Sequence, residues 1–427
     1  MKAIGSSMPT MPPTAHHVAV VGGGPGGLMA AEVLATAGVD VTVYEQMPSV
    51  GRKFLLAGRS GLNLTHSEPI DRLLTRYGPA AARLEPAIRA FPPTALRDWA
   101  EGLGQQTYVG SSGRVFPDAM RATPLLRAWL GRLAGLGVEF CTRTTWTGWA
   151  ADGSLRFTAA DGSTVSATPD ATVLALGGAS WPRVGSNGAW FEILAAQGIT
   201  TIPFRPANCG FIVNWSDHFR TAHAGAPLKN IRLTSAADGT SIRGETVITN
   251  HGIEGGAVYM LSASLRDAVE SRGSTTLLVD LHPDRSHDDL AARLAKRRTG
   301  DSRANHLRRA TGLSGVALAL VGEVQREAAA DTTDDDPDRL AALIKALPIV
   351  VTATSPIDRA ISTAGGVALT DIDESWMVRA RPGVYVTGEM IDWEAPTGGY
   401  LLQATFSTAV AAAHAILERE LRPRGRA

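Results

Sequence analysis

Residues 16–46 read HHVAVVGGGPGGLMAAEVLATAGVDVTVYEQ. The apolar run at residues 18–21 is typical of a buried parallel strand, and Gly22, Gly24 and Gly27 follow it in G-x-G-x-x-G spacing. Each glycine has a physical task. Gly22 permits a tight turn, Gly24 lets backbone approach a pyrophosphate, and Gly27 lets the following helix pack closely on the strand. The helix then presents its N-terminus to the phosphates.

The same stretch ends on an acidic residue. A second apolar run, residues 39–44, leads into Glu45, about as far downstream as an acid that accepts hydrogen bonds from a ribose 2′-hydroxyl. Isolated glycine turns are common, but here strand, glycines, helix, second strand and acid occur in order. The stretch therefore predicts a dinucleotide site, and Glu45 favours NAD or FAD over a 2′-phosphorylated nucleotide.

Composition narrows the class of protein. The chain has 427 residues, which exceeds a usual single domain, and its 41 basic and 41 acidic residues cancel. The balance argues against a nucleic-acid partner. Cys141 and Cys209 have neither C-x-x-C nor metal-ligand spacing. We therefore expect free thiols, no metal site and no disulfide-reductase chemistry.

The sequence shows neither the pattern of a signal peptide at residues 1–15 nor that of a membrane-spanning segment. Residues 1–15 lack the apolar segment of a signal peptide, and no run of about 18 apolar residues occurs. We expect a cytoplasmic protein without membrane contact and with a disordered tail at residues 1–15. The sequence leaves the oligomeric state open.

Hydrophobic patterning predicts an interrupted α/β fold. Residues 138–167 have the pattern of a β-meander, a buried run at 171–176 precedes Gly177 and Gly178, and a last buried strand at 383–387 precedes an Ala-rich helix. Between these parts the pattern changes twice. We expect a Rossmann-type FAD-binding domain at 16–204 and 356–427 and an inserted domain at 205–355, β-rich at 205–283 and helical at 284–347.

A basic loop follows Glu45. Residues 47–69 contain three glycines together with Arg52, Lys53 and Arg59. These cations suit an anion held at the neighbouring glycine turn.

Several motifs now carry a resemblance. They are GRKFLLAGRSGLNLTHSEP, GRVFP, GGASWPRVGSNG, TNHGIEGGAV, TAGGVAL and GE-x-x-D…PTGGY. In this order they resemble the aminoacetone-oxidase-type or BaiN-like FAD-binding oxidoreductases, a bacterial family of two-dinucleotide-binding-domain flavoproteins. The resemblance implies non-covalent FAD and an insert with a barrel-like and a helical part. The commoner family loop reads G-G-G-R-C-N, whereas residues 58–63 read GRSGLN, so activity that depends on that cysteine does not transfer.

The resemblance also implies a set of cofactor residues. The ADP half would contact the glycine turn and Glu45, and the acid after the last strand would lie near the ribityl chain. The full set is Gly22, Gly24, Gly27, Glu45, Arg52, Lys53, Arg59, Asn63, Gly178, Gly388, Glu389, Gly398, Gly399 and Tyr400.

Chemistry at the flavin has its own rationale. Reduction places negative charge at the N1 and C2 carbonyl edge of the ring, which a helix N-terminus stabilises, and Gly398 and Gly399 would allow its close approach. The acid or base stays unassigned. His66 and His251 lie in glycine-rich loops and Tyr400 flanks the last one, so these three are weak candidates.

The predicted function is FAD-dependent oxidoreduction, with hydride or electrons passing between NAD(P)H or a small organic substrate and a second acceptor. Only one G-x-G-x-x-G follows a strand, so NAD(P)H would dock transiently at the flavin. Alternatives are a tRNA-modifying flavoprotein and a non-catalytic FAD-binding redox sensor.

Overall fold

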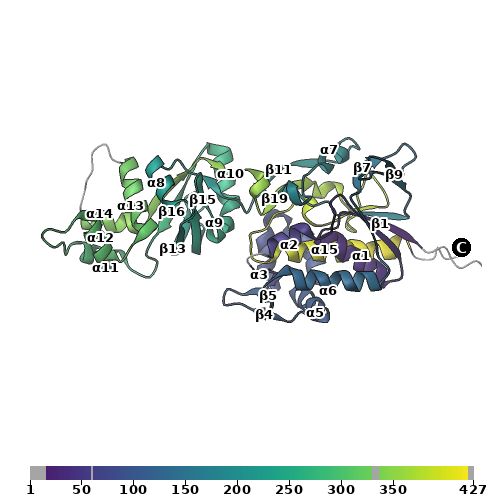
Figure 1. Cartoon of the computed structure of the whole chain (residues 1–427), viewed down its shortest axis with the longest axis horizontal. Coiled ribbons are helices and arrows are strands. Elements are labelled where there is room, and N and C mark those ends of the chain that lie inside the picture. Colours follow the sequence, from purple (N-terminus) through teal and green to yellow (C-terminus); the bar gives the residue numbers. More distant parts are fainter. Residues whose placement is uncertain (1–15, 59–60, 329–335, 422–427) are drawn as a thin grey trace, which may run out of the picture.

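The computed structural model describes residues 16–58, 61–328 and 336–421, and Figure 1 shows them as two bodies joined end to end. The expected disordered tail, residues 1–15, and the predicted cofactor residue Arg59 lie outside the described residues.

The larger body is built on a five-stranded parallel sheet. Its order is β20-β10-β1-β2-β6, and every neighbouring pair is parallel. The strands are His17–Val21 (β1), Asp40–Glu45 (β2), Glu139–Thr142 (β6), Ala171–Leu174 (β10) and Val384–Val386 (β20). Their apolar runs are buried because helices cover the sheet. All five strands end at one edge, where open α/β sheets bind ligands.

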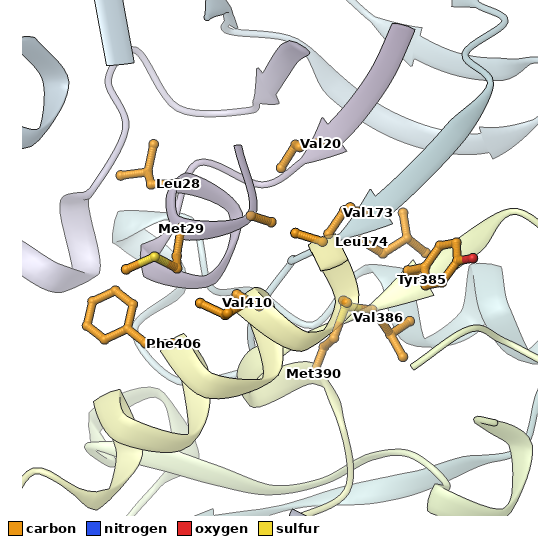
Figure 2. Packing of buried hydrophobic residues seen from close by; sticks show 14 of the residues in the cluster. Val20, Leu28, Met29, Val173, Leu174, Tyr385, Val386, Met390, Phe406 and Val410 are labelled. Atoms are coloured by element: carbon orange, nitrogen blue, oxygen red, sulfur yellow. The ribbon is translucent and has the colours of Figure 1, made fainter. Parts of the chain in front are cut away.

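Two helices from opposite ends of the chain pack together beside this sheet. Figure 2 shows Leu28 and Met29 of α1 (Pro25–Thr36) next to Phe406 and Val410 of α15 (Tyr400–Arg419). In the described parts of the chain, α15 alone is long and apolar enough to cross a membrane, and 61% of its apolar window is buried inside the protein. We regard α15 as a core helix.

Smaller elements surround the main sheet. A three-stranded sheet, β3-β5-β4, and a meander, β7-β8-β9, are both antiparallel. Their strands are Thr65–His66 (β3), Thr107–Val109 (β4), Arg114–Pro117 (β5), Thr145–Trp149 (β7), Leu155–Thr158 (β8) and Thr164–Ala167 (β9). The α-helices are Arg52–Ala57 (α2), Ile70–Leu74 (α3), Ala81–Ala90 (α4), Pro93–Gly102 (α5), Ala122–Gly135 (α6) and Trp190–Ala195 (α7). Short 3₁₀ helices are Thr75–Ala80 (η1), Pro182–Val184 (η2), Ile357–Arg359 (η3), Leu369–Asp371 (η4) and Gly388–Met390 (η5).

The smaller body contains a seven-stranded antiparallel sheet of order β17-β16-β13-β14-β15-β12-β18. Its edge strands β17 and β18 are separated by Thr352 alone, so the two edges meet and the sheet curls into a barrel-like form. The strands are Phe211–Ile212 (β12), Pro227–Ser235 (β13), Ser241–Ile248 (β14), Gly252–Glu254 (β15), Thr275–Asp280 (β16), Leu347–Val351 (β17) and Ala353–Thr354 (β18). The helices are Asp217–His223 (α8), Gly256–Met260 (α9), Ser262–Arg272 (α10), His287–Leu294 (α11), Arg303–Thr311 (α12), Gly315–Ala328 (α13) and Pro337–Lys345 (α14).

Each body has its own hydrophobic core. One cluster of buried residues draws on positions 18–199 and 367–416, and the other on positions 209–360. The antiparallel strands β11 (Thr201–Ala207) and β19 (Ser362–Val367) form the connection. This is the predicted Rossmann-type domain interrupted by a barrel-like and helical insert. The predicted limits, 205 and 355, fall within β11 and directly after β18.

Two local predictions are wrong. Residues 138–144 do not begin the meander, because β6 pairs in parallel with β2 and completes the main sheet. The sequence pattern of residues 363–372, TAGGVALTDI, predicts a hairpin region, but the segment forms no hairpin of its own because β19 pairs with β11, far upstream. In both cases the alternating pattern of the sequence identifies a strand, whereas the strand with which it pairs depends on the tertiary fold.

Candidate active site

The glycine turn after β1 gives its three glycines different surroundings. Gly22 has φ +108°, and an added Cβ would lie 2.4 Å from the carbonyl oxygen of Ala175. A Cβ at Gly27 would lie 1.9 Å from the carbonyl oxygen of Gly22, whereas one at Gly24 meets no atom within 4 Å. The first and third glycines are therefore required by backbone packing. Gly24 instead leaves open space before α1, whose N-terminus has no side-chain cap.

A cavity of about 720 Å³ extends from this turn to the N-terminus of α15. That volume is typical of cofactor and small-molecule sites. Ten of the predicted cofactor residues line it: Gly22, Gly24, Glu45, Arg52, Lys53, Asn63, Gly388, Glu389, Gly398 and Gly399. Gly27 and Gly178 lie behind the wall, and a Cβ at Gly178 would be 2.4 Å from Thr363 Oγ1.

Glu45 ends β2 at the cavity wall. Its two carboxylate oxygens accept hydrogen bonds of 2.8 Å each from the backbone amides of Gly23 and Met47. Burial raises the pKa of Glu45, and the two amides and the charge of Arg52 oppose that rise. The amides fix the orientation of the carboxylate, which retains accepting capacity for a ribose hydroxyl.

The two cations of the basic loop have different environments. Lys53 donates to Ser180 Oγ at 2.8 Å and forms a 2.7 Å ion pair with Glu389. The second carboxylate oxygen of Glu389 accepts from the backbone amide of Thr363 at 2.9 Å. Lys53 is thus already paired. Arg52 Nε, in contrast, is buried and has no hydrogen-bond partner.

The far end of the cavity is formed by the loop before α15. Gly398 and Gly399 have φ +137° and +95°, and a Cβ at Gly399 would lie 2.5 Å from the backbone of Thr65. The Asn63 amide links these segments when its oxygen accepts from the Gly399 amide at 3.3 Å and its nitrogen donates to the Thr65 carbonyl at 3.1 Å. Gly399 is the N-cap of α15, and no side chain caps it. A second helix N-terminus therefore faces the cavity with unsatisfied backbone amides.

These surroundings fit FAD. The two uncapped helix N-termini suit a pyrophosphate at one end and the charged edge of the reduced flavin ring at the other. Thr397 Oγ1 and Arg52 Nε are buried in the wall without partners, as expected of groups whose partner is a ligand.

The three acid or base candidates do not line the cavity. Tyr400 is 3% exposed, and its hydroxyl donates to Glu68 Oε1 at 2.7 Å. Burial and the nearby Glu68 carboxylate raise the pKa of Tyr400. The His66 ring stacks on Tyr400 with centroids 5.3 Å apart, and its Nδ1 accepts from the Glu68 amide at 3.1 Å.

His251 lies in the exposed turn between β14 and β15, and the glycines beside it have structural roles. A Cβ at Gly252 would be 1.8 Å from the Phe211 carbonyl oxygen, and Gly255 has φ +116° against the backbone of Thr246. Backbone packing therefore accounts for Gly252 and Gly255 in the TNHGIEGG segment. Gly256, which follows them, does line the cavity.

Arg114, Thr397 and Tyr259 line the cavity and were not predicted from the sequence. Arg114 belongs to the GRVFP motif, which was the available signal. Tyr259 lies in an apolar segment of the insert, and no motif in the sequence marks it as a site residue.

The fold, the glycine turn with its acid, and the helix N-terminus at the far end of the cavity together define an FAD-binding oxidoreductase. A family model, the HI0933-like protein Rossmann domain, matches residues 16–415, so the chain belongs to the HI0933-like family. This match confirms the resemblance found in the motifs.

Curated relatives match over almost the whole chain. The 3-dehydro-bile acid delta(4,6)-reductase of Clostridium scindens is 24% identical over 418 residues, covering 95% of this chain and 100% of the relative. The ribosomal RNA dihydrouridine synthase of Haemophilus influenzae is 24% identical over 404 residues, covering 93% and 97%. Among solved structures, the 3-ketosteroid delta1-dehydrogenase of Sterolibacterium denitrificans has a TM-score of 0.50 at 14% identity and covers 93% of this chain and 98% of that one, a likeness of fold alone.

Proposed function

We propose that this FAD-dependent oxidoreductase takes hydride from NAD(P)H and reduces a carbon–carbon double bond conjugated to a carbonyl group in a small molecule. When bound, FAD supplies a two-electron carrier that accepts hydride from one partner and returns it to another. The protein supplies binding, orientation and electrostatic stabilisation.

The names of the relatives support this class of reaction. One relative is a reductase of delta(4,6) double bonds in a 3-dehydro-bile acid, where the 4-ene is conjugated to the 3-oxo group. The other makes dihydrouridine, which requires reduction of the uracil double bond that is conjugated to a carbonyl. The two substrates differ greatly in size, but the reacting group is alike.

The observation that carries the proposal is the extension of the cavity past the N-terminus of α15. Its lining includes Phe116 and Met120 from the larger body and Gly256 from the insert. Cys141 and Cys209 are both free and both lie outside that lining. Electrons therefore have a direct route to a substrate beside the flavin, while a dithiol relay lacks its cysteine pair.

Several side chains of the protein would act in binding. Glu45 would accept from the adenosine ribose, and the α1 amides would bind the pyrophosphate. The α15 amides would stabilise negative charge on the flavin ring, which favours its reduction. Lys53 would hold Glu389 in place beside the same cavity.

A small substrate is favoured over RNA by charge. In the sequence, the basic residues at 293–309 are followed by an acidic run at 331–338, which offsets most of their charge. The exposed apolar side chain of Met120 lines the cavity. We accordingly propose a cytoplasmic enzyme that acts on a small molecule.

The test combines two half-reactions. The purified protein should be yellow and release FAD, and NADH or NADPH should bleach it without oxygen. Anaerobic cyclohex-2-enone or a 3-oxo-4-ene steroid should then restore the colour and appear as the saturated ketone. Reoxidation by uridine-containing RNA but by neither enone would favour the RNA-modifying alternative. Binding of FAD without reduction by either nucleotide would favour the redox sensor.

A further inference from the structure

Two polar side chains of the cavity wall have no established task. Arg114 comes from β5 of the larger body, and Tyr259 comes from α9 of the insert. Arg114 makes a weak interaction, from Nη2 to Met260 Sδ at 3.9 Å. Over residues 16–58, 61–328 and 336–421, no side chain hydrogen-bonds to the Tyr259 hydroxyl, and the Gly255 backbone that lies near it lowers the pKa of that hydroxyl and leaves its proton free to be donated. Both groups can therefore bind a ligand without breaking a strong interaction.

These side chains lie at the flavin end of the cavity. A Cβ at Gly61 would be 3.0 Å from Met120 Cε and 3.6 Å from Phe116 Cε1, which places this loop against β5. Asn63 in the same loop bonds to the Gly399 amide at the N-terminus of α15. The loop at residues 61–63 therefore contacts both β5, which carries Arg114, and the N-terminus of α15. Glu45 lies at the opposite end of the cavity, where adenosine would bind.

The insert meets the larger body here. Figure 1 shows α9 and α10 at the end of the insert nearest the FAD-binding domain. Met260 of α9 contacts Arg114, and Gly256 and Tyr259 of the same helix line the cavity. Tyr259 is the one titratable side chain of residues 205–328 and 336–355 in that lining. The insert therefore contributes the Tyr259 phenol to a cavity whose other titratable side chains come from the FAD-binding domain.

Other charged groups of the lining are already engaged. Glu45 is held by two backbone amides, and Lys53 is paired with Glu389. Arg52 approaches Glu45 closely enough to affect its pKa and so belongs to the adenosine end. Arg114 is left as the cation available to a substrate. Burial, with the charge of Glu254, raises the pKa of Tyr259 to about 12, so its hydroxyl stays protonated at neutral pH.

We propose that Arg114 binds the carbonyl oxygen of the substrate and that Tyr259 is the catalytic acid of the reduction. This inference rests on the proposed function. FAD, when bound and reduced, would supply the hydride that forms a C–H bond at the β-carbon, while the C=C π bond breaks and its electron pair moves to the oxygen held by Arg114. The resulting enolate takes the Tyr259 hydroxyl proton at its α-carbon, and water reprotonates Tyr259. One hydride and one proton enter, and a saturated carbonyl compound leaves.

The first test uses binding and needs no turnover. The probe is p-nitrophenol, whose phenolate resembles an enolate and whose spectrum reports its ionisation. The FAD-loaded protein should bind the phenolate and lower the apparent pKa of the probe. Arg114→Met should weaken phenolate binding about tenfold or more, as expected for loss of a charge-assisted hydrogen bond. Arg156→Met, in the exposed meander strand β8, is the matched control and should bind as the parent protein does. Equal affinity in Arg114→Met and the parent protein would overturn the role of Arg114.

The second test separates the two half-reactions. Tyr259→Phe should keep its FAD content, circular dichroism and rate of bleaching by NAD(P)H, and its reoxidation by cyclohex-2-enone should slow about 10²- to 10⁴-fold. In D₂O the parent protein should deuterate one face of the α-carbon, and Tyr259→Phe should lose that preference. Tyr108→Phe, an exposed tyrosine outside the lining, serves as control.

The outcomes distinguish the inference from the function on which it rests. Unchanged enone reoxidation and unchanged stereochemistry in Tyr259→Phe would refute the acid role while leaving enone reduction intact. A parent protein that reduces no enone would refute the proposed function. In that case, weaker phenolate binding by Arg114→Met would still support an oxyanion site at Arg114. Unchanged phenolate binding by Arg114→Met would refute the oxyanion site as well.

Discussion

Removal of the Glu45 carboxylate tests the adenosine end of the site most directly. The Gly23 and Met47 amides each donate to the Glu45 carboxylate at 2.8 Å and fix its orientation. Its remaining lone pairs can therefore accept hydrogen bonds from the ligand without a change of rotamer. A hydrogen bond to a charged acceptor contributes about 1.5–3 kcal/mol. Glu45→Ala should therefore weaken FAD binding about 10- to 150-fold.

Glu45→Ala also leaves two backbone amides without their acceptor, so its effect on folding has to be measured separately. Thermal unfolding of the FAD-free protein gives that effect, and fluorescence titration with FAD gives the affinity. Glu45→Gln should lose less thermal stability and less FAD affinity than Glu45→Ala, since its amide oxygen still accepts one backbone hydrogen bond. Glu139→Ala, on the exposed side of the neighbouring strand β6, is the control and should bind FAD normally. FAD affinity in Glu45→Ala equal to that of the control would show that the end of β2 does not contact the cofactor.

Two further predictions concern the insert and the network behind α15. Gly252→Val should destabilise the insert by on the order of 3 kcal/mol or more, because its Cβ would overlap the Phe211 carbonyl. Gly256→Val should fold and bind FAD, because a Cβ there meets open space, but it should turn over slowly because Gly256 lines the cavity. Equal unfolding of both variants by circular dichroism would contradict this. Although burial opposes ionisation of Glu68, hydrogen bonds from Arg76 and Tyr400 outweigh it and lower its pKa. Its contribution to stability should be complete above the ordinary glutamate pKa of about 4.3 and vanish as pH falls through the lower folded-state value. Between pH 6 and 3 the melting temperature of Glu68→Gln should accordingly fall less than that of the parent protein, and parallel curves would be inconsistent with the pKa shift.

The cofactor-binding fold was predictable because its signals are local. The strand, glycine turn, helix and acid all lie within residues 16–46, and their spacing reflects fixed backbone geometry. The interruption of this domain was also visible, since the hydrophobic pattern changes near residue 205. The partners of individual strands were not predictable from the sequence. An alternating pattern identifies a strand but not its neighbour, and so β6 and β19 were each assigned the wrong one.

The acid or base candidates show why composition misleads in loops. His66 and His251 were singled out for their glycine-rich surroundings, but those glycines serve backbone packing. A Cβ at Gly58 would lie 2.7 Å from the Ala122 amide nitrogen, and one at Gly252 would lie 1.8 Å from the Phe211 carbonyl oxygen. A glycine required by a close backbone contact and a glycine required by a ligand look identical in sequence.

The two ends of the cavity differ in how much of the chain builds them. The adenosine end depends largely on Gly22, Gly24 and Glu45, which are close in sequence. The flavin end combines Arg114, Tyr259 and Gly399, each from a different part of the chain, and its shape depends on how the insert is seated on the larger body. Substitutions in the insert can therefore alter the substrate chamber and leave the cofactor site intact. On the proposed function, we expect the determinants of substrate choice to lie in α9 and β5 rather than in the glycine turn. Relatives with names as different as a bile-acid reductase and an RNA-modifying enzyme would then differ mainly at these elements of one scaffold.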